Sequence, residues 1–225
     1  MALRFGLVDG ARAEQAQQRL VADIRGRDIR LSTGFVGVSH LLPVLSARGE
    51  DGLAWRLMEQ DAFPSWLFSV KHGATTIWER WDGWTPENGF QDAGMNSFNH
   101  YSLGSCGEWM YQTAAGIGLH PDAPGFQRMV IRPRPGGTLT HLAATHDSPY
   151  GRIASAWRRD AAGTTYDIVI PVNTTAEIHL AAASADAVRE GDAPAATAPG
   201  VRLVKHEDGD AIFAVGSGSY RFVVP

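Results

Sequence analysis

The spacing of apolar residues changes near residue 120, and this change constrains the fold more than any other feature of the chain. Over residues 13–24, apolar side chains recur every three or four positions, which is typical of an amphipathic helix. Over residues 166–172 they occupy every second position, which is typical of a strand. Because the linker-like stretch 120–125 separates the two patterns, we predict an α+β fold with a helical domain over 1–122 and an antiparallel β-sandwich over 123–225.

Capping residues and glycines indicate where the helices of the first domain begin and end. A first helix is predicted over residues 9–27. Ser32 or Thr33 is expected to cap a second helix, which should stop at Gly49. A third helix is predicted over residues 51–60.

The longest helix is predicted over residues 96–117, with Phe98 and Tyr101 on its apolar face. Gly104 and Gly107 lower its helix propensity, so a closely packed neighbour is the expected reason for them. Cys106 is the one cysteine of the chain. It is expected to be a packed thiol, and no intrachain disulfide is possible.

The second domain shows repeated alternation separated by turn residues. Strands are predicted over residues 166–172, 176–180 and 220–224. The stretch 173–175 is expected to be a turn. Residues 181–200 are rich in Ala, Gly and Pro and are predicted to form a variable loop region.

Composition excludes several classes of partner. The chain has 225 residues and a formal net charge of −4, without any basic run, so nucleic acid is not expected as a partner. No metal-ligand spacing is present, and we expect no metal or cofactor. No signal-like or membrane-spanning apolar run occurs. The expected location is the cytoplasm, unless a longer protein carries a signal upstream, and no membrane contact is expected.

The segment 63–109 holds the residues best suited to chemistry. It contains five of the seven tryptophans, together with Glu79, Asp82 and His100. Aromatic rings can cover the C–H faces of a sugar while carboxylates and imidazoles bind its hydroxyls. Glycoside hydrolysis also needs two carboxyl groups, one protonated and one ionised.

The same residues have structural interpretations that composition leaves open. Clustered tryptophans are often core residues. Glu79 and Asp82 flank Arg80, so a surface ion pair is an alternative to catalysis. His100 can be a hydrogen-bonded core histidine. On composition alone, a sugar enzyme is one option among several.

Several motifs, in order and spacing, make the chain resemble the α-L-rhamnosidases of glycoside hydrolase family 78. The most specific is Ala-Thr-Thr-Ile-Trp-Glu-Arg-Trp at 74–81, followed by Asn-Ser-Phe-Asn-His at 96–100. The stretches 33–37, 64–67 and 104–109 complete the similarity in the helical part. Downstream, Ile131-Arg132-Pro133 and Ser148-Pro149-Tyr150-Gly151 resemble the opening of that family's C-terminal β-domain.

The resemblance implies that residues 1–122 are the C-terminal part of an (α/α)6 six-hairpin catalytic barrel and that 123–225 form the closing β-domain. It implies inverting hydrolysis of terminal α-L-rhamnose from a glycoside or polysaccharide. Glu79 matches the glutamate taken as the general base, and His100 the histidine expected to contact the sugar. The resemblance places Trp78, Trp81 and Asp82 as lining or supporting the pocket.

No segment matches the region that carries the general acid of that family. We therefore expect a fragment that is inactive alone and whose apolar helix faces are covered by the missing N-terminal part or by a second copy of the chain. Two other functions stay open. One is a non-catalytic carbohydrate-binding fragment, and the other is a different (α/α)6 carbohydrate-active enzyme, such as a relative of glucuronyl hydrolases or trehalases.

Overall fold

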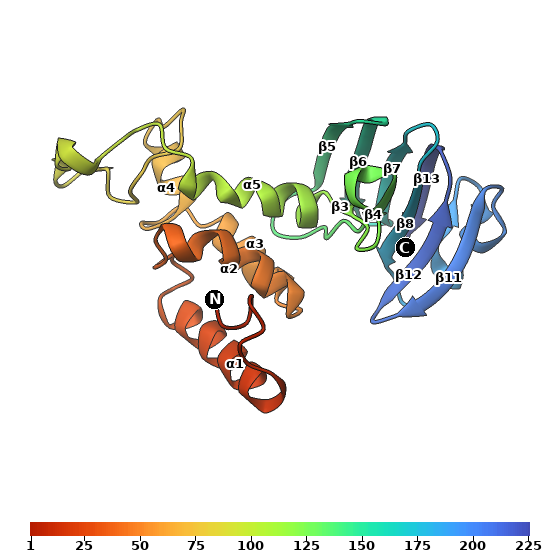
Figure 1. The fold of residues 1–225 in the computed structure, drawn as a ribbon, viewed down its shortest axis with the longest axis horizontal. Coiled ribbons are helices and arrows are strands. Elements are labelled where there is room, and N and C mark those ends of the chain that lie inside the picture. The colour runs from red at the N-terminus through yellow and green to blue at the C-terminus, as the bar shows by residue number, and fades with distance from the viewer. The chain divides into compact units, whose positions relative to one another are not determined.

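The computed structural model describes all of residues 1–225 and divides into two compact units, Met1–Trp109 and Met110–Pro225. The first unit is mainly helical, and the second is built from two sheets (Figure 1). The predicted fold class, helices followed by a sandwich, is confirmed. None of the helices combines the length and the apolar composition needed to cross a bilayer.

Four α-helices lie within residues 10–71 of the first unit. They are α1 (Gly10–Gly26), α2 (Phe35–Ala47), α3 (Asp51–Met58) and α4 (Trp66–Lys71). The predicted first and third helices are confirmed. On α1, Ala13, Val21 and Ile24 are buried, as its apolar spacing requires.

The start of α2 differs from the prediction. The helix begins at Phe35, and the residue in the cap position is Gly34, which forms no side-chain hydrogen bond. Neither Ser32 nor Thr33 caps it, because the chain at Gly34 is still extended. The predicted stop is confirmed: α2 ends at Ala47, and Gly49 adopts a positive φ of 77°, which favours glycine after a helix end.

The prediction of one long helix over 96–117 is wrong. Residues 96–101 form an irregular loop, and coiling begins only with the 3-10 helix Ser102–Ser105, followed by α5 (Cys106–Trp109) and the π-helix Met110–Ala114. Residues 97–100 instead hydrogen-bond to residues 77–79, so long-range pairing takes precedence over helical periodicity. The longest helix is α1, with 17 residues.

The two glycines near α5 behave differently. A Cβ on Gly104 would lie 3.2 Å from Cγ1 of Ile77, whereas a Cβ on Gly107 would meet nothing within 4 Å. The expected close neighbour therefore exists for Gly104 alone. Cys106 is buried, as predicted, and burial raises the pKa of its thiol.

The second unit is a sandwich of a six-stranded and a five-stranded sheet. The six-stranded sheet has the order β10 (Ala193–Pro194), β9 (Arg189–Glu190), β13 (Gly218–Val224), β7 (Gly163–Ile170), β6 (Gly151–Asp160), β5 (His141–Ser148). The five-stranded sheet has the order β11 (Val201–Glu207), β12 (Asp210–Val215), β8 (Thr175–Ala181), β4 (Arg128–Ile131), β3 (Ile117–Leu119). All pairs are antiparallel except β4 with β8.

The predicted alternation places apolar side chains in the sandwich core. Ile168 on β7, Ile178 on β8 and Phe222 on β13 are at most 1% exposed. Burial of each such apolar side chain stabilises the folded state by about 1.5–3 kcal/mol relative to leaving it exposed. Val172 departs from the pattern and is 72% exposed, because β7 ends at Ile170 before the 173–175 turn.

The predicted loop region 181–200 contains more structure than expected. It holds the short pair β9–β10 and two 3-10 turns. Val188 and Ala195 are completely buried, and Ala195 N–H donates to the carbonyl of Val188 at 2.9 Å. Small apolar side chains therefore fix this segment where composition indicates only a loop.

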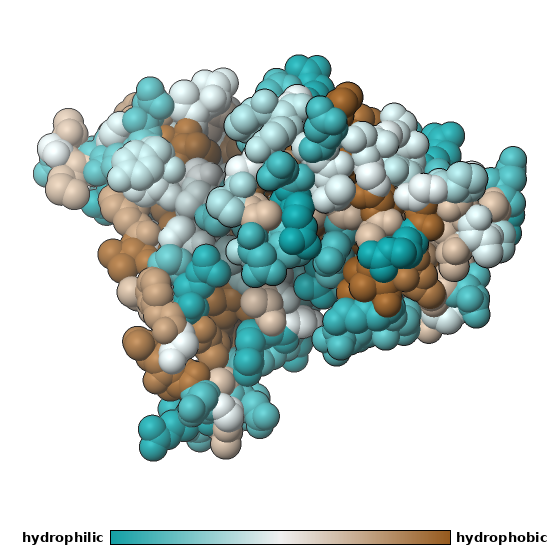
Figure 2. All heavy atoms as spheres, turned by 45° about the vertical axis from the view of Figure 1, so that its right-hand side comes forward, coloured by the Kyte–Doolittle hydropathy of each residue, from teal (hydrophilic) through white to brown (hydrophobic).

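Apolar side chains of the helical unit are also exposed. Figure 2 shows apolar atoms at the molecular surface. In the helical unit, Phe5, Leu7, Val36 and Val70 are each more than half exposed. Phe5 and Leu7 precede α1, whereas Val36 lies on α2 and Val70 on α4, so the expectation of continuous exposed helix faces stays a prediction.

Candidate active site

Two segments of the helical unit, one with Glu79 and one with His100, lie antiparallel and are joined by backbone hydrogen bonds. Glu79 N–H donates to the carbonyl of Ser97 at 2.8 Å, and His100 N–H donates to the carbonyl of Ile77 at 2.8 Å. The Thr76 hydroxyl donates to the carbonyl of Phe98. Residues about twenty positions apart are thereby held together without a regular helix or strand.

The Glu79 carboxylate is anchored on one side and open on the other. Its Oε2 accepts a hydrogen bond from Ser97 N–H at 2.7 Å. Its Oε1 makes no hydrogen bond within the chain, and the side chain is only partly buried. Arg80 is not its ion-pair partner. A carboxylate held this way can accept a proton from a water molecule.

Asp82, in contrast, is committed to an ion pair. Arg80 Nε donates to Oδ1 at 2.9 Å, and Arg80 Nη2 donates to Oδ2 at 3.0 Å. This hydrogen bonding lowers the pKa of Asp82, so the group is ionised and unsuited to donate a proton. The surface ion pair considered for Glu79 and Asp82 therefore exists for Asp82 only.

Asp82 also borders a pocket of about 500 Å³ in the helical unit. Its other polar lining side chains are Arg30, Thr85, Glu87, Asn88 and Gln91. Phe63 and Phe68 add aromatic surface. Polar groups beside aromatic rings are suited to bind a sugar.

The two tryptophans of the motif pack beneath the loop. Trp78 is 8% exposed and contacts Phe98 edge to face, with ring centroids 5.1 Å apart. Trp81 donates its indole N–H to the carbonyl of Thr33 at 2.8 Å and packs against Trp66. Both rings stabilise the loop that carries Glu79.

The His100 imidazole is held flat between two aromatic rings. Its centroid lies 4.8 Å from that of Phe35 and 5.2 Å from that of Tyr101, each ring within 9° of parallel. Nδ1 accepts a hydrogen bond from Ser102 N–H at 3.3 Å. A neutral imidazole with this acceptor carries its proton on Nε2, which has no partner within the chain and can donate to a ligand hydroxyl.

The groups that hold the site in place could not be identified from the sequence alone. Asn96 Nδ2 donates to the carbonyl of Gly83 at 2.8 Å and to that of Gln91 at 3.4 Å, which ties the motif loop together. Ser97 acts on Glu79 through its backbone N–H, which nearly any residue supplies. The side chain at position 97 therefore gives no indication in the sequence that this residue anchors Glu79. Phe35 belongs to a recognised motif, but its stacking on His100 depends on tertiary structure.

Family profiles match most of the chain. The profile of the bacterial α-L-rhamnosidase six-hairpin glycosidase domain matches residues 1–114. The profile of the bacterial α-L-rhamnosidase C-terminal domain matches residues 118–193.

Individual proteins that are similar to this chain are also named α-L-rhamnosidases. An α-L-rhamnosidase of Streptomyces avermitilis is 45% identical over 224 residues, covering 100% of this chain and 21% of its own length. Its crystal structure in complex with L-rhamnose matches with a TM-score of 0.90 at the same identity and the same coverage of both chains. One from Formosa agariphila is 36% identical over 99% of this chain and 24% of its own length. The structure of the Dictyoglumus thermophilum enzyme matches with a TM-score of 0.85 at 30% identity, over 98% of this chain and 24% of that one.

The chain thus spans about a fifth to a quarter of the length of these relatives. Its helices match part of a six-hairpin domain, and its sandwich matches the C-terminal domain. The resemblance found in the motifs is confirmed, and the chain belongs to the bacterial α-L-rhamnosidase family.

Proposed function

We propose that this chain supplies the general base and part of the sugar pocket of an α-L-rhamnosidase that releases terminal α-L-rhamnose with inversion. The observation that carries the proposal is the Glu79 carboxylate, with Oε2 fixed by Ser97 N–H and Oε1 open. Its position in the Trp-Glu-Arg-Trp motif of a family member adds support.

In this reaction Glu79 takes a proton from a water molecule. The water attacks the anomeric carbon from the face opposite the departing oxygen, which is why the configuration inverts. The Nε2–H of His100 binds a sugar hydroxyl and orients the ring. Trp78 and Trp81 support the loop that carries Glu79. Asp82 borders the neighbouring pocket of about 500 Å³, which neither Glu79 nor His100 lines, and there it would contact a more distant part of the substrate.

We also propose that the general acid lies outside residues 1–225. An inverting site places its two carboxyl groups roughly 6.5–9.5 Å apart on opposite sides of the sugar. Asp82, the nearest carboxyl in sequence, is ionised by its pairing with Arg80 and cannot protonate the departing oxygen.

The test is Glu79→Gln in a full-length enzyme that carries this chain. Glutamine keeps the shape of the side chain and can still accept from Ser97 N–H, but it cannot take a proton. We expect kcat to fall by about 10²–10⁴-fold while KM for an aryl α-L-rhamnoside changes little.

Glu14→Gln on α1 is the matched control, because Glu14 is exposed and makes no hydrogen bond or ion pair. It should leave both constants unchanged. Full turnover by a correctly folded Glu79→Gln enzyme would refute the role of Glu79. Saturable rhamnose binding by a wild-type enzyme without any hydrolysis would favour the non-catalytic function.

A further inference from the structure

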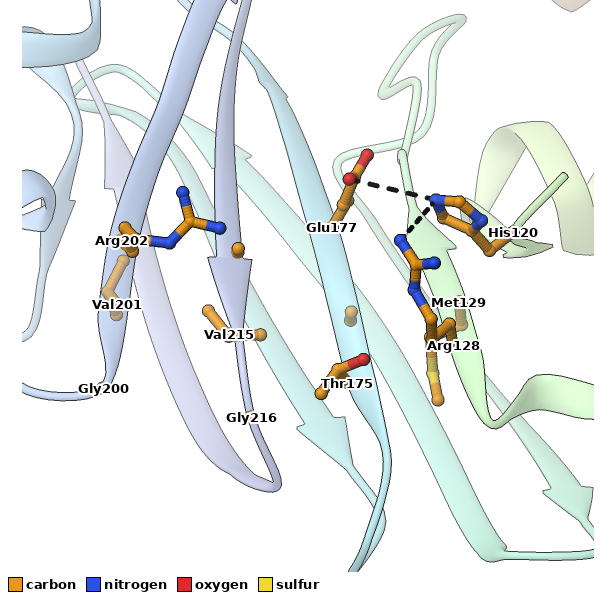
Figure 3. Close-up of a pocket in the computed structure, with 12 residues that line it drawn as sticks. His120, Arg128, Met129, Thr175, Glu177, Gly200, Val201, Arg202, Val215 and Gly216 are labelled. Carbon is orange, nitrogen blue, oxygen red and sulfur yellow. Dashed lines mark hydrogen bonds and ion pairs between the residues drawn. The ribbon is translucent and has the colours of Figure 1, made fainter. Parts of the chain in front are cut away.

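A cavity of about 550 Å³ lies on the five-stranded sheet of the second unit. It crosses four strands, β4, β8, β12 and β11. Figure 3 shows Arg202 on one side of it and the group of His120, Arg128 and Glu177 on the other. None of these residues belongs to the segment around Glu79.

The strand register places the polar lining residues on one face of the sheet. Arg128 pairs with Thr175, Glu177 pairs with Ala214, and Ala214 pairs with Arg202. Directly paired residues, and residues two apart on one strand, point to the same side. The alternate residues are at most 4% exposed and face the sandwich core: Met129, Ala176 and Val215. The polar set therefore lies on the outer face.

Small residues leave a hollow between the two arginines. Thr175 and Ala214 lie on the two strands that separate Arg128 from Arg202, and Gly216 directly follows the second of them. The two outer strands, β4 and β11, are about 14 Å apart, which corresponds to three inter-strand spacings. Pockets of roughly 300–1,000 Å³ hold small ligands, so the cavity has room for a sugar ring.

Neither arginine has an acidic partner in the chain. Arg202 makes no hydrogen bond or ion pair, whereas Arg152 and Arg221 each bind a carboxylate. Glu177 is the one carboxylate that lines the cavity. Two arginines and one glutamate give a local charge of +1 on a chain whose formal net charge is −4.

The contacts of His120 add a second unmet donor. Its ring is 9% exposed; Asp122 N–H donates to Nδ1 at 3.2 Å, and Arg128 Nη2 lies 3.1 Å from Nε2. A neutral imidazole offers one acceptor nitrogen, not two. With Nδ1 accepting, Nε2 carries a proton, which faces Glu177 Oε1 at 3.9 Å. Nε2 then cannot accept from Arg128, whose guanidinium has no other hydrogen-bond partner in the chain.

We propose that this cavity binds an acidic sugar, a pyranose that carries a carboxylate. The guanidinium of Arg202 binds the carboxylate, an arrangement in which two parallel N–H donors can be used. Thr175 and Glu177 bind ring hydroxyls, and Arg128 donates to a further oxygen. The site is independent of the proposed hydrolysis at Glu79.

The lining distinguishes this ligand from simpler ones. No Phe, Tyr or Trp side chain lines the cavity, so a neutral sugar would lack the ring stacking that usually holds it. Glu177 repels a compact anion such as phosphate but accepts hydrogen bonds from hydroxyls. The lining therefore suits a ligand with one carboxylate and several hydroxyls.

The experiment titrates the 225-residue chain with D-galacturonate, D-galactose and acetate by isothermal titration calorimetry. Galactose has a hydroxymethyl group in place of the carboxylate, and acetate lacks the sugar ring. We expect saturable binding of galacturonate, with galactose and acetate at least roughly tenfold weaker. Equal affinity for galactose or for acetate, or no saturable binding of galacturonate, would overturn the proposal.

Variants then test the location. Arg202→Gln and Arg128→Gln should each weaken galacturonate binding roughly tenfold or more, and Ala214→Leu should do so by filling the hollow without changing charge.

Arg158→Gln is the matched control, since Arg158 is exposed on β6 without a partner. Glu79→Gln should also bind normally, which separates this site from the proposed catalytic one. Unchanged binding in all three cavity variants would overturn the assignment.

Discussion

Asp210 is the one acidic residue among the buried polar side chains, and it illustrates how single residues stabilise the second unit. Arg132 Nε donates to its Oδ2 at 2.8 Å, and Arg134 Nη1 donates to Oδ1 at 2.8 Å. Burial acts to raise the pKa of Asp210, but the hydrogen bonds and charges of the two arginines outweigh it and lower the pKa. The ion pairs join the first residue of β12 to the segment that follows β4.

Asp210→Asn should lower the free energy of unfolding by about 2–4 kcal/mol, because it removes the carboxylate from an ion pair in which the side chains of Asp210 and Arg134 are only 4% and 16% exposed. Urea unfolding of the chain measures this. Asp167→Asn is the control. Asp167 pairs with Arg221 at the surface, where both side chains are more than half exposed, so its loss should cost less than about 1 kcal/mol. Equal losses would contradict this role of burial.

The same ion pairs predict a pH dependence. Because the pKa of Asp210 is lowered on folding from its ordinary 3.8, its contribution is fully present above pH 3.8. It is lost as the pH falls below 3.8 through the folded-state pKa. The stability difference between the wild type and Asp210→Asn should therefore shrink in this range, as measured by urea unfolding across pH. A constant difference would contradict the assignment.

His100 makes a separate prediction for substrate binding. In a full-length enzyme, His100→Ala should raise KM and lower kcat/KM for an aryl α-L-rhamnoside by roughly tenfold to a hundredfold, because a hydrogen bond to the sugar is lost. His141→Ala, at an exposed position of β5, should leave both unchanged. If the kinetics of His100→Ala are unaltered, His100 does not contact the substrate and only packs between Phe35 and Tyr101.

At the scale of elements, the predictions succeed where a segment's neighbours are local and fail where they are distant. The helix α1 and the strands β7, β8 and β13 follow from apolar spacing within each segment. The stretch 96–101 has helical spacing but pairs with 77–79. Its backbone hydrogen bonds therefore go to a distant segment and not to the next turn.

The glycines beside α5 test this view of packing. Gly107→Ala should stabilise the chain by about 0.5–1 kcal/mol, since alanine is the better helix former and its Cβ meets nothing. Gly104→Ala should gain nothing or lose stability, because its Cβ would lie 3.2 Å from Ile77. Thermal unfolding of both variants measures the difference. Equal stabilisation would show that the Ile77 side chain can move away from the new Cβ without lowering the stability of the chain.

At the scale of the whole molecule, the chain is two units with separate proposed tasks. Along the chain, the boundary between the compact units falls between Trp109 and Met110. The profile of the six-hairpin domain ends at residue 114, and that of the C-terminal domain begins at residue 118. The first unit carries Glu79 and His100, and the second carries the cavity with Arg128 and Arg202. We propose that hydrolysis needs parts beyond these residues, whereas acidic-sugar binding does not.

The purified 225-residue chain should therefore release no rhamnose from an aryl α-L-rhamnoside. The assay is made on a single size-exclusion peak whose mass is measured, with a full-length enzyme as the positive control. Activity in a peak that contains only this chain would mean that the general acid comes from within these residues or from a second copy.

The sequence by itself determined the two-part fold, the first and third helices, the approximate positions of three strands, and the family, because apolar spacing and motif residues are properties of short segments. It also indicated Glu79 and His100 as candidates. Only the tertiary structure decided that Ser97 N–H anchors Glu79, that Asp82 is bound by Arg80, and that residues 96–101 form a loop. It alone placed Arg128 and Arg202, 74 residues apart in sequence, on one face of a sheet. The physical reason is that such contacts depend on how distant segments pair, and no local preference of the chain encodes that register.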